Sequence, residues 1–81
     1  MRIVIECCGA SQRWCGAESV SLDLGETATV SSALDRMAER YPELAARRET
    51  LAVAIGDQIV HAGRALAEGE RLALIPPVSG G

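Results

Sequence analysis

The spacing of apolar residues changes twice along this 81-residue chain, and no other feature limits its fold as strongly. Residues 2–8 are rich in β-branched side chains and residues 19–24 alternate between apolar and polar ones, which is typical of β-strands. From Thr29 to Tyr41 apolar residues recur at helical spacing, with Thr29 as the predicted N-cap. The first half of the chain therefore predicts two strands followed by a main helix.

The second half returns to short strands. Pro42 is expected to end the main helix, and residues 42–49 predict a further turn or short helix. Residues 51–55, 58–60 and 72–75 predict strands, the last buried on both faces because it is an unbroken apolar run. Residues 9–17 contain two glycines and no periodicity, so we expect a long hairpin loop there. This order indicates an α+β fold, a mixed β-sheet packed on one main α-helix.

Size and charge exclude several classes of protein. A chain of 81 residues makes one domain. Its 11 acidic and 8 basic residues give a net charge of −3, so we expect no nucleic-acid partner and no membrane partner. No apolar run approaches the ~20 residues of a membrane-spanning helix, and the chain enters its first strand without a signal peptide. We therefore expect a cytoplasmic protein.

The three cysteines do not form a metal-binding motif. Cys7 and Cys8 are adjacent in a predicted strand and would point to opposite faces, and no Cys-x-x-Cys pair is present, so we expect no metal site with His61. We predict that Cys7 is a core residue and that His61 is a solvated loop residue. Cys15 is expected to be an inert loop thiol, with a reactive thiol or persulfide relay beside Trp14 as the alternative.

The last six residues indicate a chemical role for the end of the sequence. Two prolines end the last strand and stiffen an extended segment, which at ~3.3 Å per residue reaches roughly 20 Å. A terminal Gly-Gly has no Cβ atoms and leaves its carboxylate accessible to an enzyme. The alternative is a frayed terminus. We predict a folded domain of residues 1–75 and a tail of residues 76–81 that inserts into a partner: Pro76, Pro77, Val78, Ser79, Gly80 and Gly81.

Residues 66–81, LAEGERLALIPPVSGG, resemble the C-terminal signature of the sulfur-carrier subunit of molybdopterin synthase, in the MoaD/ThiS family of ubiquitin-like β-grasp proteins. The rest of the chain is similar in layout. It has a first strand, a loop with an arginine, a strand that ends near Gly25, and a helix that opens with Thr-Val and closes with Tyr-Pro. The resemblance implies a ubiquitin-like β-grasp fold.

The resemblance also implies a carrier cycle in molybdenum cofactor biosynthesis. A ubiquitin-activating-type adenylyltransferase would use ATP to adenylate the Gly81 carboxylate, and a sulfur donor protein would convert it to a thiocarboxylate. The tail would then enter the large subunit of molybdopterin synthase and give its sulfur to cyclic pyranopterin monophosphate. The domain itself would be non-catalytic and would bind no cofactor. Two small subunits would flank a large-subunit dimer in a heterotetramer.

Three further residues are candidates for partner contacts. Ile75 is expected to be an apolar anchor for the large subunit, as is Val78, unless Ile75 fills the core. Arg13 and Trp14 come next, because arginine and tryptophan are enriched in interface hot spots. Trp14 has a structural alternative, which is to cover a core poor in aromatic residues.

Other functions remain open. The chain could carry sulfur for thiazole, cysteine or another product, or modify proteins as ubiquitin does. It could also be a plain β-grasp interaction module with an idle tail. Deletion of Gly81 separates these classes, because a carrier would lose all activity and a module would keep its binding.

Overall fold

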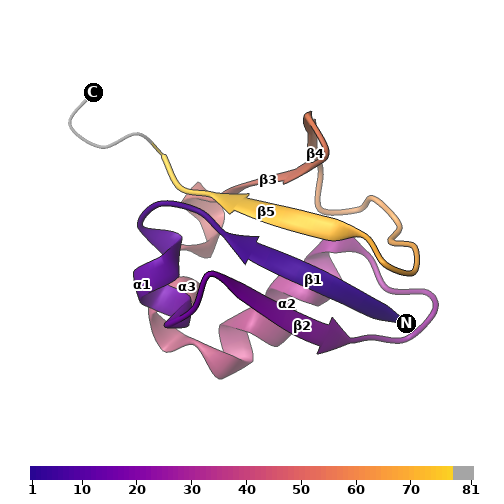
Figure 1. Ribbon diagram of the computed structural model, residues 1–81, viewed down its shortest axis with the longest axis horizontal. Helices are drawn as coiled ribbons and strands as arrows, with labels where there is room; N and C mark the ends of the chain where they lie inside the picture. Colours follow the sequence, from indigo (N-terminus) through magenta and orange to yellow (C-terminus); the bar gives the residue numbers. More distant parts are fainter. Residues whose placement is uncertain (78–81) are drawn as a thin grey trace.

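A five-stranded mixed sheet forms the centre of the computed structural model, which describes residues 1–77. The strand order is β2-β1-β5-β3-β4 (Figure 1). β1 and β5 are parallel, whereas the other neighbouring pairs are antiparallel. The strands are β1 (Arg2–Cys7), β2 (Ser19–Asp23), β3 (Ala52–Ile55), β4 (Gln58–Val60) and β5 (Arg71–Ile75).

Helix α2 (Val30–Arg40) is the main helix and lies behind the sheet in Figure 1. A capping box starts it: the Thr29 hydroxyl accepts a hydrogen bond from the Ser32 backbone N–H, and the Ser32 hydroxyl accepts one from the Thr29 N–H. Tyr41 is extended, and Pro42 begins helix α3 (Pro42–Arg47), which is followed by the 3-10 turn η1 (Arg48–Thr50). The predicted N-cap and helix end are confirmed.

The two faces of the sheet differ. The inner face, which packs against α2, contains side chains with no exposed surface, among them Ile3 and Ile5 of β1 and Leu72 and Leu74 of β5. Met37 of α2 is equally buried in the same cluster. The opposite, outer face is turned toward the viewer in Figure 1 and carries no helix among the described elements. The α+β prediction, a mixed sheet on one main helix, is confirmed.

Residues 9–17 connect the antiparallel strands β1 and β2, as predicted, but the expectation of an irregular loop is wrong, because the connection contains helix α1 (Ser11–Cys15). Gly9 and Gly16 bracket the helix with φ of 55° and 68°, a left-handed conformation that glycine adopts without strain. Ser11 and Cys15 lie four residues apart and are buried together. A helix of five residues is too short to show a period in the sequence, which explains the error.

The prediction that the last strand is buried on both faces is also wrong. Leu72 and Leu74 are fully buried, but Arg71 and Ile75 on the outer face are exposed. An apolar run indicates a strand covered on both sides, yet α2 covers only one of them. Within residues 1–77, every helix falls short of the length and apolar character that crossing a membrane requires.

Candidate functional site at the end of the central strand

The chain leaves the sheet from its middle. β5 lies between β1 and β3, where Leu74 is opposite Cys7 and Ile75 is opposite Ala52. Pro76 is half-buried and Pro77 is exposed. Neither proline has a backbone N–H, so the sheet ladder ends at Ile75. The predicted insertion residues Val78, Ser79 and Gly80 and the predicted reacting residue Gly81 lie outside the described residues, and their roles stay predictions.

The segment between β1 and α1 holds the end of β5. The Cys8 N–H donates to the Leu74 carbonyl at 3.4 Å. The buried Ser11 hydroxyl lies 2.7 Å from the Cys8 carbonyl and 3.4 Å from the Leu74 carbonyl. A Cβ atom at Gly9 would lie 3.8 Å from Cγ of Pro76, so the Gly9 backbone is beside the proline ring. The point of exit is therefore packed against a second part of the chain.

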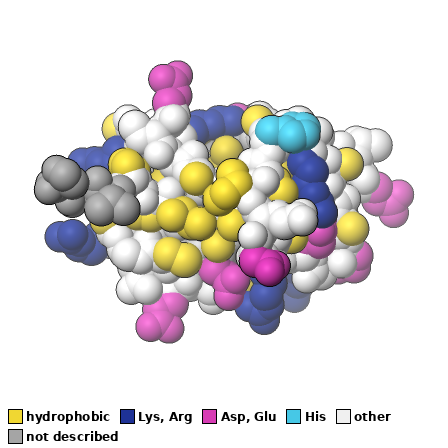
Figure 2. Space-filling view, turned by 90° about the horizontal axis from the view of Figure 1, so that it is seen from above, with side chains coloured by type: hydrophobic (Ala, Val, Ile, Leu, Met, Phe, Trp, Pro, Cys, Tyr) yellow, Lys and Arg dark blue, Asp and Glu magenta, His cyan; other side chains and the backbone are white. Residues whose placement is uncertain are grey.

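The outer face next to the exit is apolar. Cross-strand pairs place Ile59 and Ala73 on either side of Ala54, and Ile75 beside Ala52. Ile59 is 68% exposed and Ile75 is 37% exposed. Figure 2 views the molecule from the side of β3 and β4, at 90° to Figure 1, and shows hydrophobic side chains in the middle of that side. The outer apolar patch is defined by five residues of the register: Ala52, Ala54, Ile59, Ala73 and Ile75.

The patch bears on two sequence predictions. Ile75 does not fill the core, which leaves the partner contact as its predicted role. Ile59 was missed, because Gln58–Val60 is a short strand whose sequence does not reveal which side faces solvent. The sequence signal that could have indicated its exposure was a large apolar side chain, Ile59, directly after the polar Gln58 in a short strand.

Arg13 and Trp14 lie on α1, close to the exit. Arg13 is exposed. Trp14 is half-buried against the core, and the Arg47 guanidinium carbon lies 5.1 Å from its ring centroid in a cation–π contact. Trp14 thus has the structural role of covering one end of the core. Contact of either residue with a partner remains a prediction.

The cysteines differ in exposure. Cys7 is buried, as predicted, whereas Cys8, just beyond the end of β1, is exposed. Burial, together with the neighbouring Cys15 thiol, raises the pKa of the Cys7 thiol to about 12. Cys15 is buried at the end of α1, so its interpretation as a loop thiol is wrong. His61 is exposed in a loop, where its Nδ1 accepts a hydrogen bond from the Gly63 N–H at 3.1 Å.

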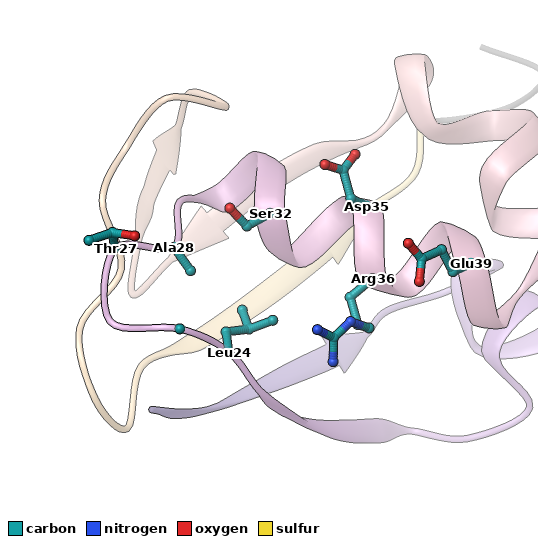
Figure 3. Close-up of a pocket in the computed structure, with 8 residues that line it drawn as sticks. Leu24, Thr27, Ala28, Ser32, Asp35, Arg36 and Glu39 are labelled. Carbon is teal, nitrogen blue, oxygen red and sulfur yellow. The ribbon is translucent and has the colours of Figure 1, made fainter.

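Metal ligands do not gather in the described part of the chain: residues 1–77 contain no group of three or more His, Cys, Asp or Glu side chains that could hold an ion. A hollow of about 330 Å³ opens at the opposite end of the sheet from Pro76, between the β2–α2 loop and α2 (Figure 3). Two of its charged residues already have partners, since Asp35 pairs with Arg48 and Arg36 donates to the Asp23 carbonyl. The hollow therefore places no reactive group beside the point where the chain leaves β5.

Sequence comparison assigns the chain to a family of small proteins. The model of the ThiS family matches residues 10–81. Small archaeal modifier protein 1 of Haloferax volcanii is 35% identical over 74 residues, which cover 82% of this chain and 85% of that protein. Its crystal structure superposes with a TM-score of 0.91 at 29% identity and full coverage of both chains. The predicted ubiquitin-like β-grasp fold is confirmed by this match.

Two solved complexes contain chains of the same fold. One is the complex of subunits 1 and 2 of molybdopterin-converting factor from Helicobacter pylori, with 20% identity, full coverage of both chains and a TM-score of 0.71. The other is the BexX/CysO complex of Amycolatopsis orientalis, with 22% identity, coverage of 98% and 99%, and a TM-score of 0.77. At this identity the likeness concerns the fold.

Proposed function

The chain belongs to the ThiS family, whose ubiquitin-like β-grasp members are sulfur carriers or protein modifiers, and we propose that it is the sulfur-carrier subunit of molybdopterin synthase. The observation that supports this most is the departure of Pro76 and Pro77 from the central strand, in a sequence that continues as Val-Ser-Gly-Gly. Such a segment can bring a carboxylate into an enclosed active site while the domain stays outside.

In the proposed cycle, the reacting group is the Gly81 carboxylate. An adenylyltransferase of the ubiquitin-activating type joins it to AMP and releases pyrophosphate from ATP. Sulfur at the sulfide level, supplied by a sulfur-donor protein, displaces AMP and leaves a thiocarboxylate. This sulfur then passes to cyclic pyranopterin monophosphate in the large subunit. The chain contributes no acid, base or cofactor to these steps, and the cycle takes place in the cytoplasm, where thiols stay reduced.

The outer apolar patch is the proposed docking surface for the large subunit. Ile59 and Ile75 expose apolar surface on the outer face, and Ile75 directly precedes the two prolines. Exposed apolar clusters of this kind mark interaction sites. The Helicobacter pylori complex, which pairs a chain of this fold with a second subunit, supports such a partner. We expect docking of the patch to bring the tail to the active site of the large subunit.

Intact mass spectrometry tests the proposal. The chain is incubated with ATP, a sulfur donor and the host adenylyltransferase, and we expect a mass increase equal to replacement of one oxygen by sulfur. Fragmentation should place the change at Gly81. Adding the large subunit and cyclic pyranopterin monophosphate should reverse it. Loading without discharge would indicate another sulfur pathway, such as thiazole or cysteine synthesis, and no loading would leave an interaction module.

Two control variants make the result specific. A chain that lacks Gly81 should not be loaded, although its domain is unchanged. Cys8→Ala removes the exposed thiol and should be loaded normally. A persulfide on Cys8 would add a sulfur without loss of oxygen and would disappear on reduction, so mass and reductant together distinguish the two products.

A second function, protein modification, is favoured by the 35% identity to small archaeal modifier protein 1. In that case the activated Gly81 carboxylate would form an isopeptide with a target lysine. All eight basic residues of this chain are arginines, so it has no lysine to accept a second copy. Tagged chain recovered from host cells would then be found on other proteins as single copies.

A further inference from the structure

We propose that Ser11 is a positioning residue that fixes the direction in which the C-terminal segment leaves the sheet. The inference rests on the proposed function, because this direction matters if the segment enters a partner. Ser11 is fully buried, and it is the one polar residue within residues 1–77 in the buried class. A hydroxyl at such a position needs a hydrogen-bond partner.

The contacts of Ser11 connect the segment after β1 with the end of β5. Its hydroxyl donates to the Cys8 carbonyl at 2.7 Å, and the Leu74 carbonyl lies 3.4 Å away. The hydroxyl has a single hydrogen. The 2.7 Å contact to the Cys8 carbonyl is therefore the main hydrogen bond, and the 3.4 Å contact to the Leu74 carbonyl is the weaker branch of a bifurcated bond. One side chain thus faces a carbonyl group of the segment after β1 and a carbonyl group of β5, next to the exit.

The start of helix α1 does not require this hydroxyl. The Ser11 backbone N–H already donates to the Cys8 carbonyl at 3.1 Å. Alanine is a better helix former than serine and would fill the buried position without a polar atom. With alanine the Cys8 carbonyl would keep the Ser11 N–H and the Leu74 carbonyl would keep the Cys8 N–H, so the loss is the side-chain link between the segment before α1 and the end of β5. The hydroxyl is therefore not needed to start the helix, and its further contact is with the end of β5.

The same segment also restrains the first proline. Gly9 has φ of 55° and its backbone lies beside the Pro76 ring, while the Cys8 N–H donates to the Leu74 carbonyl at 3.4 Å. The pyrrolidine ring fixes the φ angle of Pro76. Because the Gly9 backbone packs beside that ring, it restricts the direction in which the chain continues after Pro76. Restricting a segment before binding lowers the entropy lost on binding. Ser11 keeps this neighbour in place.

A double-mutant cycle with the large subunit of molybdopterin synthase tests the inference. Its four members are the full chain, Ser11→Ala, the chain without residues 78–81, and the combination, with Kd measured for each. Loss of one neutral hydrogen bond should weaken binding of the full chain about fivefold. In the shortened chain Ser11→Ala should have little effect, because residues 78–81, which follow the positioned prolines, are gone.

Thr50→Ala is the matched control, because Thr50 also donates from its hydroxyl to a carbonyl, that of Arg47, at 2.7 Å. It should leave Kd unchanged in both chain lengths. Pro76→Ala gives a second route: if Ser11 acts through Pro76, the two substitutions should weaken binding by less together than the product of their separate effects. Thermal unfolding should show that all variants are folded.

Three results would overturn the inference: equal weakening in the full and shortened chains, independent effects of Ser11→Ala and Pro76→Ala, or a Ser11→Ala chain that does not fold. The last would show that the hydroxyl is needed for the domain itself. Failure of the proposed function looks different, since removal of residues 78–81 would then leave the Kd of the unsubstituted chain unchanged.

Discussion

Cys7 and Cys8 are neighbours in the chain, yet their side chains lie in different environments: Cys7 ends β1, and Cys8 follows it outside the strand. Cys7 is 3% exposed on the inner face beneath the helices, whereas Cys8 is exposed. The same contrast separates Leu74, which is fully buried, from Ile75, which is 37% exposed. The inner face holds the domain together, and the outer face is left for a partner. Each prediction below tests this division.

The largest expected effect is on thiol reactivity. A maleimide at mildly alkaline pH should label Cys8 at once, because the thiolate is the nucleophile and Cys8 is exposed. Cys7 has a pKa raised to about 12 and reacts only when the fold opens, so its labelling should be slower by about a thousandfold or more. Peptide mapping by mass spectrometry gives both rates. Rapid labelling of a Cys8→Ser chain would contradict the division, and denaturant should expose the remaining thiols.

Truncation of neighbouring residues in β5 should give the next largest difference. Leu74→Ala removes a fully buried side chain and should lower the free energy of unfolding by about 2–5 kcal/mol. Ile75→Ala, the same kind of truncation on the outer face, should cost less than about 1 kcal/mol. Urea unfolding followed by circular dichroism measures both. Equal losses would mean that the outer face contributes to the core.

Partner binding should show the opposite pattern. Ile59→Ser should leave the free energy of unfolding within about 0.5 kcal/mol, because Ile59 is 68% exposed. It should weaken binding to the large subunit about tenfold if the outer apolar patch is the docking surface. Gln58→Ser, one position away on the other face of β4, is the matched control and should bind normally. Calorimetric titration of both variants with the large subunit shows which face of β4 contributes to binding.

The strand and helix periodicities of the sequence were sufficient to predict the main secondary structure elements. Val20 and Leu22 alternate with polar residues, and the structure buries both. Thr29 and Pro42 marked the ends of α2 by local chemistry, a side-chain cap and a missing N–H, which operates without tertiary contacts. Signals of this kind depend on residues close together in the chain, and the sequence contains them.

The errors concern features that depend on distant parts of the chain. Helix α1 is a single turn, and packing of Ser11 against β5 accounts for it better than any periodic pattern. The exposure of Ile75 depends on whether a second layer covers the outer face, which an apolar run does not reveal. The candidate site was predicted from residues 76–81 with Ile75, Arg13 and Trp14 as partner contacts, so the surroundings supplied by Cys8 and Ile59 were missed.

The smallest effect concerns two ion pairs near β5. Arg71 Nη1 lies 3.4 Å from Glu6 Oε2 on the outer face, with side chains 64% and 45% exposed. Arg64 Nη1 lies 2.7 Å from Glu70 Oε1 in the loop before β5, where the side chains are 36% and 19% exposed. Water screens the first pair more strongly than the second. We therefore expect the Glu70 pair to contribute more to stability than the Glu6 pair.

The hydrogen bond from Arg64, together with one from the Ala67 N–H, holds the pKa of the Glu70 carboxyl below its usual range. A depressed pKa stabilises the fold above the pKa of the unfolded chain, and this stability is lost as pH falls through the lower folded value. Glu70→Gln should therefore lower the urea midpoint at about pH 7, and the difference from the unsubstituted chain should shrink as pH falls through the lowered pKa of Glu70. A midpoint difference for Glu70→Gln that persists in acid would assign its effect to the side chain's uncharged contacts, and the charge on the loop would then play no part in holding β5.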